Sequence, residues 1–146
     1  MRAKCRLRRY QGVRPMLRVI SLLAAVTLSA STMAASVEGV WKTETNDEGG
    51  YLEITVSPCS ENASLTCGLI TQAVRSDGPN PDYEHIGKLM IEDMQRDDER
   101  RFSGGTIWDP EADKVYKSKM QLDGNELEVE GCIAFFCDGQ TWTRVE

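Results

Sequence analysis

The C-terminal stretch of this sequence decides the fold. It reads Gly131-Cys132-Ile133-Ala134-Phe135-Phe136-Cys137-Asp138-Gly139-Gln140-Thr141-Trp142-Thr143-Arg144-Val145-Glu146. Two cysteines bracket a short turn, and a strand-like run follows in which Trp142 and Arg144 share one face because side chains alternate along a strand. Gly39-Val40-Trp41 opens the first strand-like run of the chain. We expect these two ends to meet and close a β-barrel.

Residues 1–35 have the organisation of a secretory signal peptide. Basic residues precede a largely apolar run of 12 residues, and small residues follow it. The run is shorter than the roughly 20 residues that span a bilayer, so we expect cleavage after Ala34 or Ala35 and no stable membrane insertion. Met16 is an alternative start, and Arg8-Arg9 leaves twin-arginine export as an alternative to the Sec route. Without a cysteine at the cleavage point, the sequence predicts a periplasmic or secreted protein that is not a lipoprotein.

The predicted mature domain, residues 36–146, is strongly acidic. Residues 1–35 contain seven of the 17 basic side chains and none of the 23 acidic ones, which leaves ten basic and 23 acidic side chains, a formal net charge of −13. Nucleic-acid affinity depends on neutralising phosphates, and anionic membrane surfaces attract basic segments. The charge therefore argues against both kinds of partner, and we expect an acidic, solvated monomer.

Four cysteines remain after the leader is removed, namely Cys59, Cys67, Cys132 and Cys137. An even number in an exported chain indicates disulfides, with three connectivities available. Local pairing, Cys59 with Cys67 and Cys132 with Cys137, is the most economical of the three. With a single histidine and no Cys-x-x-Cys pair, the sequence does not favour a metal site.

The mature chain alternates strand-like runs with turn signals. Eight runs are expected, at residues 40–46, 51–56, 67–74, 86–94, 102–108, 114–122, 126–133 and 140–145. A short helix is the alternative for 86–94, because several of its residues favour helix. Short connections between the runs predict an all-β fold, either an antiparallel up-and-down barrel of about eight strands or a compact sandwich.

Two breaks in this pattern carry specific expectations. Gly104-Gly105 lies inside a run and predicts a bend in that strand. Residues 75–85 form the longest break, and their two prolines and one glycine are expected to keep residues 77–82 out of any sheet. That segment is the predicted rim loop or lid. Asp109, Glu111 and Asp113 invite a calcium interpretation, although turn chemistry explains them more simply.

The sequence resembles a bacterial exported family, domain of unknown function 2147. The matching stretches cover nearly the whole mature chain: Gly39-Val40-Trp41, Cys67-Gly68-Leu69-Ile70, Asn80-Pro81-Asp82, Ile86-Gly87-Lys88-Leu89-Met90, Ser103-Gly104-Gly105-Thr106-Ile107-Trp108-Asp109-Pro110, Lys114-Val115-Tyr116, Gly131-Cys132 and Gln140-Thr141-Trp142-Thr143-Arg144-Val145. The resemblance implies a periplasmic or secreted protein with a lipocalin-like β-barrel, and it implies no established activity.

The chain is also similar to lipocalins in general. They open with Gly-x-Trp and carry a late arginine that packs over the tryptophan at the closed barrel end. Gly39, Trp41 and Arg144 are the matching positions, and Trp142 lies beside them in the pattern. We expect these residues to close the barrel, while direct contact with a ligand remains the alternative role. The chain is much shorter than a typical lipocalin, which argues against a deep calyx.

Candidate ligand-binding residues are the aromatic and methionine side chains on the predicted strands. Tyr51, Trp108, Tyr116 and Met120 are the positions that we assign to binding, with ordinary core packing as the simpler alternative. His85 lies in the long loop, but no nucleophile-elbow context surrounds Ser76 or Ser103. The sequence thus selects no catalytic set, and we expect neither an enzyme nor a cofactor.

Two functions follow from these observations. The first is a periplasmic binding module for a small apolar or amphipathic ligand. The alternative is a protein-interaction module of the cell envelope, such as a stress factor or a protease inhibitor, that acts through its rim loops. Residues 75–85, with 109–113 as a neighbour, form the candidate interaction surface.

Overall fold

A computed structural model describes residues 36–145, and the predicted signal peptide with its start and cleavage point lies outside this part of the chain. The strands are β1 (Gly39–Lys42), β2 (Tyr51–Pro58), β3 (Thr66–Arg75), β4 (Gly78–Pro79), β5 (Leu89–Arg96), β6 (Arg101–Ser103), β7 (Thr106–Asp109), β8 (Lys114–Asp123), β9 (Glu126–Ile133) and β10 (Phe136–Arg144). No helix among the described residues is long and apolar enough to cross a bilayer.

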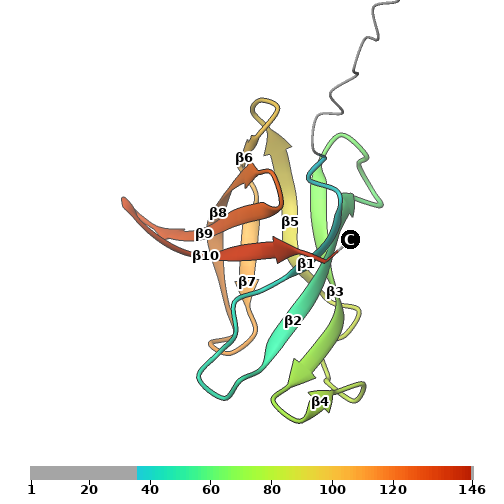
Figure 1. The fold of residues 1–146 in the computed structure, drawn as a ribbon. Coiled ribbons are helices and arrows are strands. Elements are labelled where there is room, and N and C mark those ends of the chain that lie inside the picture. Colours follow the sequence, from blue (N-terminus) through green and yellow to red (C-terminus); the bar gives the residue numbers. More distant parts are fainter. Residues whose placement is uncertain (1–35, 146) are drawn as a thin grey trace, which may run out of the picture. The chain divides into compact units, whose positions relative to one another are not determined.

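These strands form one closed antiparallel barrel (Figure 1). Each long strand pairs with its neighbours in the chain, β3 pairs with β5, and β1 pairs with β10 to close the ring. β6 and β7 both pair with β5 and β8, so they are two halves of one strand. Counted in this way the barrel has eight strands, and the predicted up-and-down architecture is confirmed.

The structure corrects three strand boundaries. We expected the first strand to reach Asn46, but β1 ends at Lys42 because Thr43 turns toward Leu52, exchanging hydrogen bonds of 2.9 and 3.0 Å. The final strand begins at Phe136 rather than at Gln140, since pairing with β9 continues to the tip of the hairpin. The run at 86–94 becomes strand from Leu89 onward, as pairing with β3 outweighs its helical propensity.

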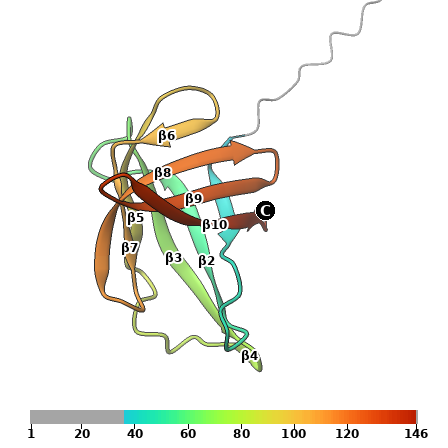
Figure 2. The same ribbon diagram turned by 90° about the vertical axis from the view of Figure 1, so that its left-hand side faces the viewer.

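The long loop also departs from expectation at one point. Gly78 and Pro79 pair with Arg75 and Val74 and form the two-residue strand β4. The expectation that residues 77–82 stay out of any sheet is therefore wrong for these two positions. Proline is tolerated there because β4 is an edge strand, where its missing N–H removes no interior ladder bond. The rest of the loop connects β4 to β5 (Figure 2).

The predicted glycine bend separates β6 from β7. Gly104 has a left-handed φ of +77°. A Cβ atom on Gly105 would lie 2.2 Å from the carbonyl oxygen of Glu92, so a side chain does not fit at this position. The two glycines let one strand bend sharply and continue along the same neighbours, which supports the curvature of a small barrel.

Side chains fill the interior of the barrel. The largest completely buried ones come from nearly every strand: Trp41, Trp142, Phe102, Ile54, Ile70, Ile91, Met94, Leu122, Leu127 and Val56. Ser118 is also buried, and its hydroxyl donates to the Glu130 carbonyl at 2.9 Å. Small barrels of this strand number are typically filled in this way, and the buried apolar side chains form one continuous core between the strands.

The first and last strands meet at the predicted seam. Trp41 pairs with Arg144, whose guanidinium carbon lies 4.2 Å from the centre of the indole ring. The guanidinium also donates to the carbonyl of Glu38 at 2.9 Å and to the carbonyl of Ser36. The Trp41 indole N–H donates to the Val37 carbonyl at 2.8 Å. One cation therefore ties the N-terminal segment, β1 and β10 together.

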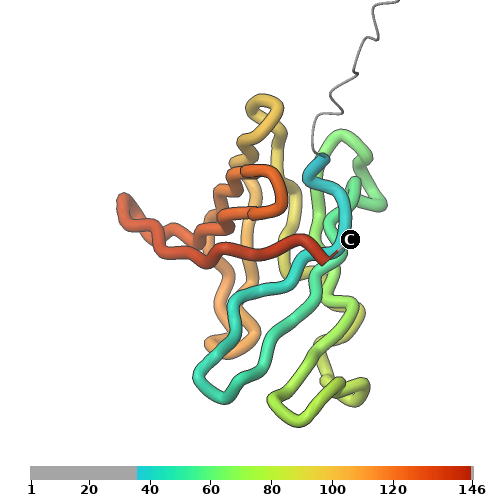
Figure 3. Tube along the Cα trace, viewed as in Figure 1, coloured from blue at the N-terminus to red at the C-terminus, as the bar shows by residue number. Residues whose placement is uncertain are grey.

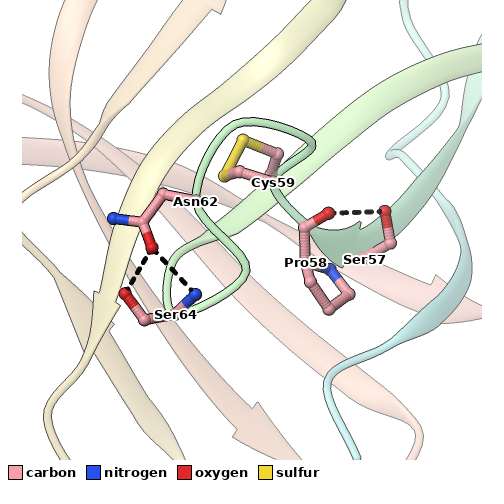
Figure 4. Close-up of a disulfide and its surroundings, with 6 residues drawn as sticks. Ser57, Pro58, Cys59, Asn62 and Ser64 are labelled. Carbon is pink, nitrogen blue, oxygen red and sulfur yellow. Dashed lines mark hydrogen bonds between the residues drawn. A yellow bond between two sulfur atoms is a disulfide. The ribbon is translucent and has the colours of Figure 1, made fainter.

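Both predicted disulfides form. Cys59 and Cys67 join the two ends of the loop between β2 and β3, with a Cα–Cα distance of 4.9 Å (Figure 4). Asn62 orders the loop they enclose, because its side-chain oxygen accepts from both the backbone N–H and the hydroxyl of Ser64. Cys132 and Cys137 join β9 to β10 across their hairpin at a Cα–Cα distance of 4.0 Å.

Replacing Arg144 with methionine should destabilise the barrel. The change keeps the aliphatic stem but removes the cation–π contact and the two bonds to carbonyls, and we expect unfolding free energy to fall by about 1–3 kcal/mol. Chemical denaturation measures the effect. Arg96→Met is the matched control, because the Arg96 guanidinium lies over the ring of Phe102 at 5.4 Å on the surface, away from the seam. An equal loss of unfolding free energy in the two variants would show that the contacts of Arg144 stabilise the barrel no more than an ordinary surface contact does.

Candidate functional site

Four connections lie at one end of the barrel. An up-and-down chain places alternate connections at the same ends of its strands, and we call residues 43–50, 76–88, 110–113 and the turn 134–135 the rim, with the turn 134–135 projecting sideways from it (Figure 1). The seam and the loop closed by Cys59 and Cys67 belong to the opposite end. The candidate functional site is therefore the rim, which carries the long loop that the sequence analysis singled out.

The four residues assigned to ligand binding lie in different environments. Met120 and Tyr116 share the inward face of β8, where Met120 is buried and Tyr116 is partly exposed. Ile107 of β7 pairs with Tyr116 and shares its face of the sheet. Trp108 is the next residue along β7 and is partly exposed, so strand alternation places it on the opposite face. The structure thus brings Tyr116 and Trp108 to neighbouring strands but not to one surface.

Tyr51 lies apart from these residues. It alternates with the inward-facing Leu52 and Ile54, and the ammonium of Lys42 lies 4.1 Å from the centre of its ring. Lys42 pairs with Glu53 and with Thr143 at the wall of the barrel. Tyr51 therefore takes part in a cation–π contact on the outer wall, and the structure does not place it with Trp108 or Tyr116.

An aromatic group that the sequence analysis did not assemble lies at the rim. The ring of His85 contacts Tyr83 at 5.0 Å and Trp108 at 4.9 Å, edge to face in both cases. The ammonium of Lys88 lies 2.8 Å from His85 Nδ1 and 5.5 Å from the Trp108 ring centre. We call Tyr83, His85, Lys88 and Trp108 the rim cluster. Three of its members come from the long loop and fold onto β7.

Charges around the rim cluster act on Tyr83. Burial raises the pKa of Tyr83 above its usual value, and the carboxylates of Glu111, Glu84 and Asp109 raise it further. Its phenol is therefore a neutral hydrogen-bond donor at ordinary pH. The ammonium of Lys88 lies 2.8 Å from His85 Nδ1, and His85 Nε2 lies 3.7 Å from the Glu84 carboxylate. The cluster offers donors and aromatic faces for binding.

Catalytic and metal interpretations receive no geometric support in residues 36–145. The Ser103 hydroxyl donates to Asp97 at 3.0 Å, whereas the neighbours of His85 are aromatic rings, Lys88 and Glu84. Asp109 caps its own turn by accepting the backbone N–H of Glu111 at 2.9 Å. Cys59 and Cys67 lie close to the carboxylate of Asp93, but their disulfide leaves no thiolate to bind a metal.

The hairpin of β9 and β10 carries the most exposed apolar surface of the described chain. It extends beyond the rest of the barrel wall (Figure 3). At its tip Ile133 is 65%, Phe135 99% and Phe136 83% exposed. Ala134 adopts a left-handed φ of +54°, which costs a residue with a Cβ roughly 1–2 kcal/mol. The disulfide beside the turn offsets this strain by holding the two strands together.

From the sequence, residues 133–136 are interpreted only as a turn closed by a disulfide, and their exposure is not predicted. The available signal was its composition, because turns are usually polar while Ile133 to Phe136 are all apolar. Their exposure depends on how far the hairpin projects. β8 pairs with β9 only as far as Lys117 opposite Cys132, so the last residues of the hairpin have no third strand beside them.

Two shallow, open hollows of the described residues lie away from the rim cluster. Both are beside the turn between β5 and β6, and the larger, with a volume of about 550 Å³, is lined by residues 98–101 and Gln121. The second borders it and includes Phe102 and Lys119. Exposed charged side chains form most of both surfaces, so neither resembles an enclosed apolar site.

The fold and the seam define a lipocalin-like β-barrel protein. A solved structure described as "Protein HP1028 from the human pathogen Helicobacter pylori belongs to the lipocalin family" is similar at 15% identity and a TM-score of 0.56, covering 75% of this chain and 82% of that one. Residues 39–144 match the family described as "Uncharacterized protein conserved in bacteria (DUF2147)", and the chain belongs to this family. No curated protein matches the sequence.

Replacing Cys132 or Cys137 with serine should lower thermal stability and expose one free thiol. The short loop that the bridge closes corresponds to about 2 kcal/mol in the chain-entropy treatment, and release of the strain at Ala134 favours fraying of the tip. Thermal unfolding and thiol titration measure the two effects. The double serine variant is the control, with the same loss of stability and no free thiol. Release of Cys59 or Cys67 by either single variant would contradict the pairing.

Proposed function

We propose that this chain is an exported protein-interaction module of the bacterial cell envelope that binds its partner at the rim. The observation that carries the proposal is the exposed apolar tip, Ile133 to Phe136, held rigid by a disulfide on a barrel whose interior is filled. Exposed aromatic side chains on a preorganised element are typical anchors of interfaces. A filled core leaves the surface as the place for binding.

Export to the periplasm is part of this proposal. The basic, apolar and small-residue regions of residues 1–35 support it. Two disulfides in the described chain also fit folding in an oxidising compartment. In an oxidising compartment the Cys132–Cys137 disulfide at the tip stays formed, so the predicted location supports the proposed interaction.

A photo-crosslinking residue placed at Phe135 should capture a defined partner in the envelope of the host. The position is almost completely exposed, so its replacement leaves the barrel intact. A crosslinker at Ile86 on the rim should capture the same partner, identified by mass spectrometry, whereas one at Gln121 is the control because it faces solvent on the outer wall of β8. Equal yields at all three positions would contradict binding at the rim.

A second candidate function is the binding of a small amphipathic ligand at the rim cluster. The specific observation in its favour is a cation, Lys88, beside the partly exposed ring of Trp108. Such a pair suits a ligand with an acidic head and an apolar tail. Met120 and Trp41 are buried and do not contact a ligand at the rim unless the core opens.

Tryptophan fluorescence tests this second candidate. Trp41 and Trp142 are 0% and 1% exposed, so Trp108 is the accessible member of the three. Dodecanoate should shift the emission of the mature protein to shorter wavelength, because its alkyl chain would exclude water from the Trp108 ring. The Trp108→Phe variant should show no shift, and Lys88→Met should weaken it. An unchanged spectrum in the unaltered protein would remove this candidate and leave the interaction module untouched.

A further inference from the structure

One edge of β10 has no strand beside it. β1 pairs with β10 only at Trp41 opposite Arg144 and Lys42 opposite Thr143, and then turns away toward β2. Residues 136–141 continue to pair with β9 on their other side, and all six are exposed. Figures 1 and 2 show the hairpin diverging from the segment that follows β1. The closed barrel therefore has an open stretch of edge at the rim.

The register shows which backbone groups face this edge. The N–H of Arg144 donates toward the β9 side, to Asn125, while that of Val145 donates to Val40 of β1. N–H groups alternate along a strand, and the register between β9 and β10 has no shift. Cys137 and Gly139, on the same alternation as Val145, therefore direct their N–H and C=O groups away from β9.

The disulfide gives an independent check on this assignment. The Cα atoms of Cys132 and Cys137 are 4.0 Å apart, close to the short spacing of a non-hydrogen-bonded pair. In such a pair the backbone groups of both residues point away from the partner strand. Gly139 lies two residues further along and has the same orientation.

Carboxylates already occupy acceptor positions along the edge. Glu44 Oε1 accepts the N–H of Thr141 at 2.7 Å, and Asp138 Oδ1 accepts the N–H of Gly139 at 3.0 Å. Native sheets usually protect an exposed edge with lysine, proline or a covering segment. Residues 136–141 contain neither lysine nor proline. Side-chain acceptors on flexible stems are readily exchanged for the carbonyls of an added strand.

The charge and the apolar tip define the chemistry of that strand. Glu44 and Asp138 contact the edge. Asp47 and Glu48 lie in the same connection as Glu44, and residues 43–50 and 133–143 contain no lysine or arginine. A segment with basic side chains would complement these carboxylates, and an apolar side chain would cover Phe136. A second copy would bring the same carboxylates, and its predicted mature domain carries another net charge of −13, so it fits poorly.

We propose that the edge of β10 from Phe136 to Thr141 receives an extended, basic segment of another protein as an additional β-strand. Main-chain bonds to Cys137 and Gly139 supply the pairing, and the acidic flanks select the sequence. This inference rests on the proposed interaction module and names the chemistry of its partner. It also accounts for the rigid hairpin, since a fixed edge loses less entropy on pairing.

A heptapeptide that alternates lysine and valine is the probe. Its binding to the mature protein is measured by fluorescence anisotropy, and amide hydrogen exchange is followed by NMR. We expect the amides of Cys137 and Gly139 to become protected. The glutamate–valine counterpart and a lysine–valine peptide interrupted by proline should each bind at least about tenfold more weakly. Protection elsewhere with no change at these two amides would overturn the proposal.

Variants separate pairing at the edge from other modes of binding. Thr141→Pro removes an N–H that faces the edge and leaves the bonds to β9 in place, so it should weaken peptide binding at least about tenfold. Glu44→Lys combined with Asp138→Lys reverses the two exposed carboxylates that contact the edge and should weaken binding about tenfold. This second variant keeps the test valid if Thr141→Pro unfolds the protein. Phe135→Ser is the control that retains the edge. Binding that survives both changes would refute the proposal.

The outcomes also distinguish this inference from the function on which it rests. Partner capture by a crosslinker at Phe135, together with no peptide pairing at the edge, would refute the added strand and keep the interaction module. Peptide pairing at the edge without specific capture at Phe135 would keep the added strand and refute the interaction module. Concentration-dependent dimerisation that protects Cys137 and Gly139 without peptide would identify a second copy as the occupant and overturn the proposal of a basic partner.

Discussion

The closure of the barrel depends on one contact, the guanidinium of Arg144 over the indole of Trp41. β1 and β10 share only two residue pairs, whereas β10 shares eight with β9 on its other side. The cation compensates for this short ladder because it also bonds to carbonyls of the segment before β1. With the ends held in this way, the remaining strands follow by hairpin pairing. The residues of the seam are the easiest to recognise in the sequence, and their contacts in the structure join strands and the N-terminal segment.

The short seam has a consequence at the other end of β10. Because β1 leaves after Lys42, the strand continues into the hairpin with one side unpaired, and the tip reaches beyond β8. The barrel interior is meanwhile filled by large side chains such as Trp142 and Phe102. Apolar surface available for binding therefore lies on the hairpin and at the rim cluster. In this small barrel, packing of the core and recognition at the surface are separated.

The hairpin of β9 and β10 is held by a disulfide and not by residues that favour a tight turn. Ala134 takes a left-handed conformation without the freedom of glycine, and the apolar residues of the turn give it no hydrogen-bonding side chain. The Cys132–Cys137 bridge restricts the unfolded and frayed states of this segment. An oxidising compartment would preserve that restraint, so the predicted export and the geometry of the hairpin support the same interpretation.

The sequence by itself determined the strand count, the disulfide pairing, the glycine bend and the seam, because alternation, cysteine spacing and Gly-x-Trp are local signals. From the sequence, Tyr51, Trp108, Tyr116 and Met120 are grouped as one binding set. The face on which each side chain lies depends on strand register and on how the loops pack against the strands. The rim cluster needed the return of residues 83–88 onto β7, and the free edge needed the early departure of β1. Only the tertiary structure decided these features, since they arise from contacts between segments far apart in the chain.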